Sequence, residues 1–282
     1  EEFCTNPLVK KLTFTGSTAV GKKLAQNCAP QLKRVSMELG GHAPFIVFDD
    51  ADISQAVRAA MLGNFYTQGE VCTNCTRVFV QRSVYQAFID ELKTRTENNI
   101  VMGDPLDPNV NLGALISKKH QELVLNYIAK GKEEGATLIT GGNAASPQSA
   151  PNGYFVEPTI FTDCTDDMTI VKEEIFGPVL SILRFESEEE AVAIANDTPY
   201  GLTNYVQSAD GARRVRLARQ LRVIQVTFGS HKHMKTAVER LQVLWTLTDH
   251  GIVNGVHTDL SQLLQNLRHL FQLRPIELNI LT

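Results

Sequence analysis

The sequence lacks long apolar runs and basic blocks and has few cysteines, and each absence excludes a class of protein. No stretch approaches the roughly 20 apolar residues that span a bilayer. The 27 basic and 31 acidic residues are mixed along the chain and leave a net charge of −4, so nucleic acid is not an expected partner. Five scattered cysteines do not make the disulfide framework of a small secreted domain, which favours a reducing compartment.

The chain also opens without Met and without the basic, apolar and small-residue layout of a signal peptide. We therefore expect that the true N-terminus, with any targeting segment, is absent, and we expect a cytoplasmic protein, with a mitochondrial one as the alternative. With 282 residues and 43% apolar composition, the chain can form one large or two ordinary domains.

Apolar β-branched runs alternate with helical periods, which predicts an α/β fold. Expected strands are 12–15, 34–39, 44–48, 76–81, 137–140, 155–161, 179–185 and 202–208, and expected helices are 18–29, 53–65, 85–100, 118–134, 187–194 and 212–221. Ser187 and Glu190 are expected to form a capping box at the start of the helix that runs through Ile194. After Leu221 this alternation stops, and residues 260–270 carry Leu at helical spacing. Something different is expected to begin there.

FTGSTAVGK offers a possible phosphate cradle, because Gly16, Ser17 and Gly21 surround the start of a helix that follows a strand. Backbone amides at a helix N-terminus attract anions such as a pyrophosphate, and glycine permits close approach. The pattern is not GxGxxG, and a simple helix N-cap is the competing interpretation.

Two further motifs carry reactive side chains. MELGG places Glu38 at a strand end, and GEVC places Cys72 in a glycine-containing loop 34 residues later. A carboxylate in such a position can serve as a general base and a cysteine as a nucleophile. The competing interpretations are a solvated glutamate and a small core cysteine.

Cys72 and Cys75 form a CxxC pattern, which suggests a redox pair or half of a zinc site. There is no second CxxC, and His42 stands alone, so no metal is expected. A redox pair would need a helix at the first cysteine, whereas TRVFVQ predicts a strand. His231 and His233 are expected to be solvated.

KEEIFGP brings acidic side chains beside an aromatic ring and a Gly-Pro stop. Glu174 could bind a ribose hydroxyl pair, with Phe176 against a planar ring. The alternative is an acidic turn before a buried strand.

Taken in order, six motifs resemble the aldehyde dehydrogenase superfamily over about residues 8–221: FTGSTAVG, MELGGHAPFIVFDDADI, FYTQGEVCTN, GYFVEPTIF, MTIVKEEIFGPV and ANDTPYGL. The resemblance implies part of a Rossmann-type cofactor domain over residues 1–40, an α/β catalytic domain over 41–221 and a divergent tail over 222–282. It also implies a partial chain, without the first Rossmann strands and the oxyanion Asn, and hence no NAD-dependent oxidation by this chain alone.

The resemblance further implies that Cys72 attacks a small aldehyde, that hydride passes to NAD, with NADP as the alternative, and that Glu38 activates water for thioester hydrolysis. Gly16, Ser17 and Gly21 would belong to the cofactor cleft, and Glu174 and Phe176 would lie beside ribose and nicotinamide. Full-length members are expected to form homo-oligomers.

Two departures from the family pattern stand beside the nucleophile: Glu70 replaces the usual Gln, and Cys75 the usual Gly. QGEVCTNCTRVFVQ and MTIVKEEIFGPVLSI look most like the betaine-aldehyde and aminoaldehyde group, whereas ELGGHAPFIVF is similar to succinate-semialdehyde dehydrogenases. Two other hypotheses remain open: an inactive truncated isoform that acts through subunit association, and a CxxC redox protein.

Overall fold

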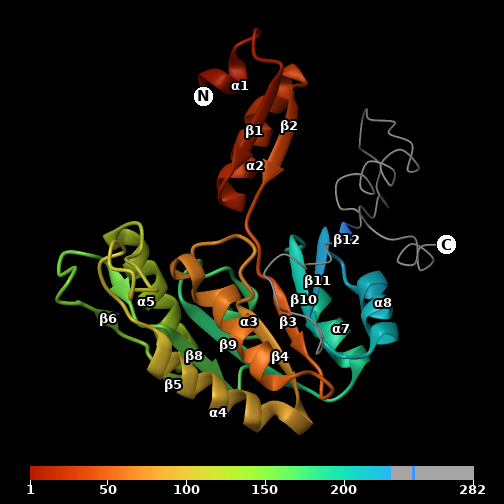
Figure 1. Cartoon of the computed structure of the whole chain (residues 1–282). Coiled ribbons are helices and arrows are strands. Elements are labelled where there is room, and N and C mark those ends of the chain that lie inside the picture. The colour runs from red at the N-terminus through yellow and green to blue at the C-terminus, as the bar shows by residue number, and fades with distance from the viewer. Residues whose placement is uncertain (230–242, 245–282) are drawn as a thin grey trace, which may run out of the picture. The chain divides into compact units, whose positions relative to one another are not determined.

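The computed structural model describes residues 1–229 and 243–244 (Figure 1). Most of the tail lies outside the described residues, including His231, His233 and the Leu-rich stretch 260–270. Strands and helices alternate through the described chain, so the α/β prediction is confirmed. No helix among the described residues is long and apolar enough to cross a membrane.

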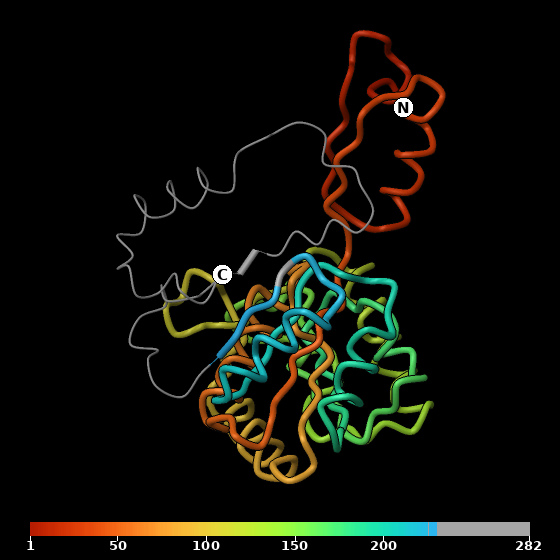
Figure 2. The backbone as a smooth tube through the Cα atoms, turned by 90° about the vertical axis from the view of Figure 1, so that its right-hand side faces the viewer, coloured from red at the N-terminus to blue at the C-terminus, as the bar shows by residue number. Residues whose placement is uncertain are grey.

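Residues 1–40 form a βαβ unit (Figure 2, red). Its elements are α1 (Glu2–Thr5), β1 (Lys11–Thr15), α2 (Thr18–Cys28), a 3₁₀ turn (Ala29–Gln31) and β2 (Arg34–Glu38). The two strands pair in parallel, with Thr15 opposite Glu38. Their carboxyl ends therefore meet at one edge, where the chain turns into α2 on one side and leaves for the rest of the fold on the other.

The remaining main strands form one eight-stranded sheet in the order β12-β11-β10-β3-β4-β9-β8-β5. Its strands are β3 (Pro44–Val47), β4 (Arg77–Gln81), β5 (Thr137–Thr140), β8 (Thr159–Thr162), β9 (Val179–Phe185), β10 (Thr203–Gln207), β11 (Gln225–Gly229) and β12 (Val243–Leu244). The edge strands β5 and β12 pair antiparallel, and the other pairs are parallel. A small hairpin of β6 (Ala144–Ala145) and β7 (Phe155–Val156) lies apart from this sheet.

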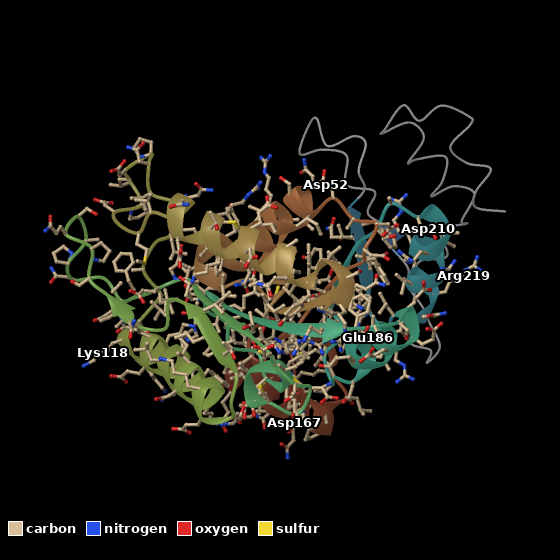
Figure 3. All side chains as sticks on the ribbon, turned by 90° about the horizontal axis from the view of Figure 1, so that it is seen from below. Asp52, Lys118, Asp167, Glu186, Asp210 and Arg219 are labelled. Atoms are coloured by element: carbon tan, nitrogen blue, oxygen red, sulfur yellow. The ribbon has the colours of Figure 1, made fainter. Side chains whose placement is uncertain are left out.

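Helices cover both faces of the sheet, because the central strands β3 and β4 bury apolar side chains on both faces. The helices are α3 (Ile53–Phe65), α4 (Arg82–Asn99), α5 (Lys118–Glu133), α6 (Thr169–Lys172), α7 (Glu188–Asn196) and α8 (Gly211–Gln220). On one face α3 and α4 pack against Phe45 and Val78, and on the other α5 to α8 pack against Ile46 and Phe79. Asp52 and Asp210, labelled in Figure 3, cap α3 and α8.

The structure differs from the sequence expectations at three places. The expected strand 155–161 is two strands, β7 and β8, interrupted at Pro158. Ser187 caps α7, but the Glu190 carboxylate accepts from the Glu186 amide instead of closing a capping box on Ser187. The sheet also continues beyond Leu221, because β11 pairs in parallel with β10, where the sequence showed no strand-helix alternation.

Candidate active site

Glu38, Gly16 and Ser17 meet at the carboxyl ends of β1 and β2. The Gly16 amide donates to the Glu38 carbonyl oxygen at 3.0 Å. Gly16 has φ of +156°, and an added Cβ would lie 2.6 Å from the Phe14 ring, so a side chain there would strain the backbone and displace that ring. The Ser17 hydroxyl accepts from the Val20 amide at 3.4 Å and caps α2. Ser17 thus forms the helix N-cap that was the competing interpretation of the possible phosphate cradle.

Gly21 has a packing role in this structure. It lies buried on α2, and an added Cβ would come within 2.4 Å of a Leu39 methyl carbon. The absence of a side chain therefore lets α2 approach the residue that follows β2. Its contribution to a cofactor cleft would be indirect, through the position of α2.

Two glycines bring the Glu38 segment against the other two motifs. The Gly41 amide donates to Glu174 Oε1 at 3.0 Å, and a Cβ on Gly40 would lie 2.2 Å from Glu174 Oε2. A Cβ on Gly41 would lie 2.2 Å from the Cys72 carbonyl oxygen. MELGG, GEVC and KEEIFGP therefore converge, and the residues that permit the close approach are the glycines, to which the sequence reasoning gave no role.

Cys72 differs from the other four cysteines in exposure, because it is half-buried in a turn before β4 and the others are buried. Burial raises the pKa of Cys75 and of Cys164 to about 12. The turn itself is fixed by the Tyr205 hydroxyl, which donates to the Thr73 carbonyl at 2.8 Å. Cys72 is therefore the thiol best placed to react.

Cys75 lies beneath α3. Its amide donates to the Gly63 carbonyl at 2.9 Å, and a Cβ on Gly63 would come within 2.5 Å of the Cys75 sulfur. This environment is that of a core thiol, and it disfavours the CxxC redox hypothesis. Within residues 1–229 and 243–244, no group of three or more His, Cys, Asp or Glu side chains could hold a metal ion.

Glu174 and Phe176 lie in the loop between α6 and β9. Burial raises the pKa of Glu174, and the hydrogen bond from the Gly41 amide acts in the opposite direction. Phe176 has φ of +59°, and its ring meets the His120 ring edge-on at 6.2 Å between centroids. His120 was not among the residues singled out from the sequence.

Sequence reasoning also missed a buried polar network that joins the segment after Glu38 to the segment after Cys72. His42 Nδ1 and the Thr76 hydroxyl lie 2.6 Å apart, and Arg77 Nε donates to the His42 carbonyl at 2.9 Å. Arg77 also donates to the Ile194 and Ala195 carbonyls at the end of α7. Burial, followed by the charge of Arg77, lowers the pKa of His42 to about 3. The sequence signal that could have identified these residues is their position, because His42 directly follows MELGG, and Thr76 and Arg77 directly follow CTNC.

The sequence profile of the aldehyde dehydrogenase family matches residues 1–239. This chain belongs to the aldehyde dehydrogenase family. The enzyme family that the sequence resemblance indicated is therefore confirmed.

Curated relatives point to one group within the family. The chain is 55% identical over 212 residues to the betaine aldehyde dehydrogenase of Agrobacterium fabrum, covering 75% of this chain and 43% of that protein. It is 44% identical over 267 residues to that of Brucella anthropi, covering 90% and 54%. The chain thus spans about half the length of the curated relatives that it matches.

Solved structures agree with the fold. The NAD-dependent aldehyde dehydrogenase of Sinorhizobium meliloti is 37% identical with a TM-score of 0.78, over 81% of this chain and 44% of that one. A betaine aldehyde dehydrogenase mutant from Staphylococcus aureus, in complex with NAD+ and with a BME-modified cysteine, is 35% identical with a TM-score of 0.79, over 82% and 47%. An NADP-dependent Escherichia coli enzyme is also similar, at 40% identity and a TM-score of 0.77, over 81% and 47%.

Proposed function

We propose that this chain carries the nucleophile and the general base for NAD(P)-dependent oxidation of an aldehyde to its carboxylic acid. Cys72 is the nucleophile and Glu38 the base. The observation that carries this proposal is the contact at Gly41, which lies against the Cys72 carbonyl oxygen three residues after Glu38 and donates its amide proton to Glu174. One short segment thereby relates all three motifs.

The Cys72 thiolate adds to the aldehyde carbon, and the resulting oxyanion accepts a hydrogen bond from the Cys72 amide. The nicotinamide cofactor supplies the hydride acceptor when it is bound. Glu38 then takes a proton from the water that attacks the Cys72 thioester, which releases the acid and frees the thiol. Each step uses a side chain of the segments that Gly41 brings together.

The residues present fit part of a dinucleotide site. Gly16 leaves the start of α2 without a side chain, and a helix N-terminus attracts phosphate oxygens. Glu174 would accept from ribose hydroxyls while it holds the Gly41 amide. We assign NAD as the cofactor, with NADP as the alternative, and we propose a cofactor part (1–40) followed by a catalytic part that begins at residue 41 and continues past the expected boundary at Leu221, because β11 belongs to its sheet.

We propose betaine aldehyde or an aminoaldehyde as the substrate, because the curated relatives reported above carry the betaine aldehyde name and the motifs around Cys72 resemble that group. Full-length assemblies would be homo-oligomeric, and the compartment cytoplasmic. The alternative function is that of a catalytically inactive chain that acts only by associating with other subunits.

Hydrolysis of p-nitrophenyl acetate tests the proposal, because it requires Cys72 and Glu38 but no hydride acceptor. We expect hydrolysis by the 282-residue chain, its loss in Cys72→Ala, and acyl-enzyme accumulation in Glu38→Gln. Substrate class is tested by protection of Cys72 against iodoacetamide, with betaine aldehyde, 4-aminobutyraldehyde and succinate semialdehyde compared. Hydrolysis that survives Cys72→Ala would overturn the assignment.

A further inference from the structure

Backbone strain gathers on two loops of the candidate site. Five non-glycine residues in the described part of the chain have positive φ, and three of them are Thr67, Gln68 and Phe176. Thr67 and Gln68 precede Cys72, and Phe176 lies in the Glu174 loop. Such conformations cost about 1–3 kcal/mol each and persist only where neighbouring groups hold them. The contacts that hold these loops therefore bear on the site.

The two loops meet directly through their backbones. Gly69 has φ of +77°, and an added Cβ would lie 2.1 Å from the Gly177 carbonyl oxygen. Gly69 is three residues before Cys72, and Gly177 directly follows Phe176. A displacement of the Phe176 loop would therefore also displace the loop that carries Cys72.

A third segment, residues 113–120, ties both loops together. Gln68 Oε1 accepts from the Gly113 amide at 3.1 Å, and Glu70 Oε1 accepts from the Ile116 amide at 3.2 Å. On the first turn of α5, His120 Nε2 lies 2.7 Å from the Phe176 carbonyl oxygen and 3.6 Å from Glu70 Oε1. Because a carbonyl oxygen only accepts, Nε2 must carry a proton and donate it.

The His120 ring is not needed to begin α5. Ser117 already caps that helix, with its hydroxyl accepting from the His120 amide at 3.2 Å. The side chains of His120 and Glu70 are only 16% and 14% exposed, so they are not a solvated surface pair. The side-chain contacts of His120 and Glu70 described above are made with each other, with the Phe176 carbonyl and with the Ile116 amide.

We propose that His120 is a positioning residue that, together with Glu70, holds the Phe176 loop against the nucleophile loop. His120 acts through the Phe176 carbonyl, and Glu70 orients His120 and anchors the Ile116 amide. The inference rests on the proposed function, since it assigns these residues to the site of Cys72. It also gives a role to Glu70, which stands where the family usually has Gln.

The experiment compares His120→Leu, His120→Gln and Glu70→Gln, with Lys119→Gln as a matched control at an exposed neighbouring position on α5. Two quantities are measured on the 282-residue chain: amide hydrogen exchange in peptides covering residues 173–179, and kcat and KM for p-nitrophenyl acetate. His120→Leu removes the donor, and His120→Gln keeps one.

For His120→Leu we expect faster exchange at the Phe176 and Gly177 amides and a kcat lower by about 10-fold, with KM changed by less than about 3-fold, because a misplaced reacting group affects the chemical step most. His120→Gln should recover most of both losses. Glu70→Gln, which keeps an acceptor for the Ile116 amide, should give a smaller loss, and Lys119→Gln none.

Unchanged exchange and kcat in His120→Leu would overturn the inference, and so would a His120→Gln variant no better than His120→Leu. Failure of the proposed function gives a different result, namely ester hydrolysis that survives Cys72→Ala. In that case the exchange at the Phe176 and Gly177 amides still decides whether His120 holds the loop.

Discussion

The βαβ unit of residues 1–40 and the sheet that begins at β3 use the same alternation of strand and helix, but they bury their side chains very differently. No residue of β1 or β2 is buried, and the buried hydrophobic side chains of this unit are Cys4 and Cys28. In β3 all four residues are buried, and in β4 four of five. The sheet that begins at β3 thus contains its own core, whereas residues 1–40 contribute mainly turns and a helix N-terminus.

This difference in burial implies that the candidate site residues of the two regions are held in place in different ways. Cys72 and its partners are attached to strands inside a core, where positions are over-determined by packing. Gly16, Ser17 and Glu38 are attached to strands whose faces are open, so their geometry depends on local hydrogen bonds. Regions with few buried apolar contacts open at lower free energy than core strands.

The largest expected difference is between two arginines, one in residues 1–40 and one in the sheet that begins at β3. Arg77→Ala should lower the free energy of unfolding by about 3 kcal/mol or more, because it leaves the buried His42 and Ala195 carbonyls and the partly buried Ile194 carbonyl without their donor. Arg34→Ala, at an exposed position of β2, should stay within about 0.5 kcal/mol. Urea unfolding followed by circular dichroism measures both. Equal effects would remove the contrast between the two parts.

The second effect depends on pH. The pKa of His42 falls from its ordinary 6.5 to about 3 in the folded chain, so the stability due to neutral His42 is complete above pH 6.5 and is lost as pH falls toward 3. Residues 1–40 contain no histidine. Wild type should lose a few kcal/mol more than His42→Gln over this interval, measured by urea unfolding at each pH. Parallel losses in the two proteins would show that His42 does not stay neutral.

Two glycines sharpen the comparison further. Gly41→Ala places a Cβ against the Cys72 carbonyl, which is backbone, so it should cost about 1–3 kcal/mol and slow ester hydrolysis by about 10²-fold. Gly21→Ala meets only the mobile end of Leu39 and gains up to about 1 kcal/mol of helix propensity, so its net effect should be near zero. Hydrolysis rates and thermal unfolding of both variants check this. Similar losses would mean that α2 is packed as tightly as the catalytic core.

The smallest effect is expected at Glu174. Burial raises its pKa in the folded chain, so its contribution to stability is present below the ordinary glutamate pKa and is lost as pH rises through the folded value. Glu174→Gln keeps an acceptor for the Gly41 amide and cannot ionise. It should therefore raise Tm slightly at pH 7 and leave it unchanged at pH 4. A lower Tm at pH 7 would show that the charge strengthens the Gly41 bond more than burial opposes it.

Local pattern was enough for most elements of the fold. The sequence predicts a helix over 53–65, and α3 spans Ile53–Phe65, because its apolar period is a local signal. The sequence pattern did not predict strand β11 (Gln225–Gly229). This short strand is recognised by its pairing with β10, and strand pairing is not a local property of the sequence.

The sequence by itself determined the family and the α/β class, because motif order and hydrophobic period are properties of the chain read in order. Only the tertiary structure decided which residues meet. Gly41 contacts Cys72, His120 reaches Phe176, and Arg77 holds His42 across gaps of 31, 56 and 35 positions. Such contacts follow from the order of the strands and the close approach that glycine permits, and neither can be read from a local window of sequence.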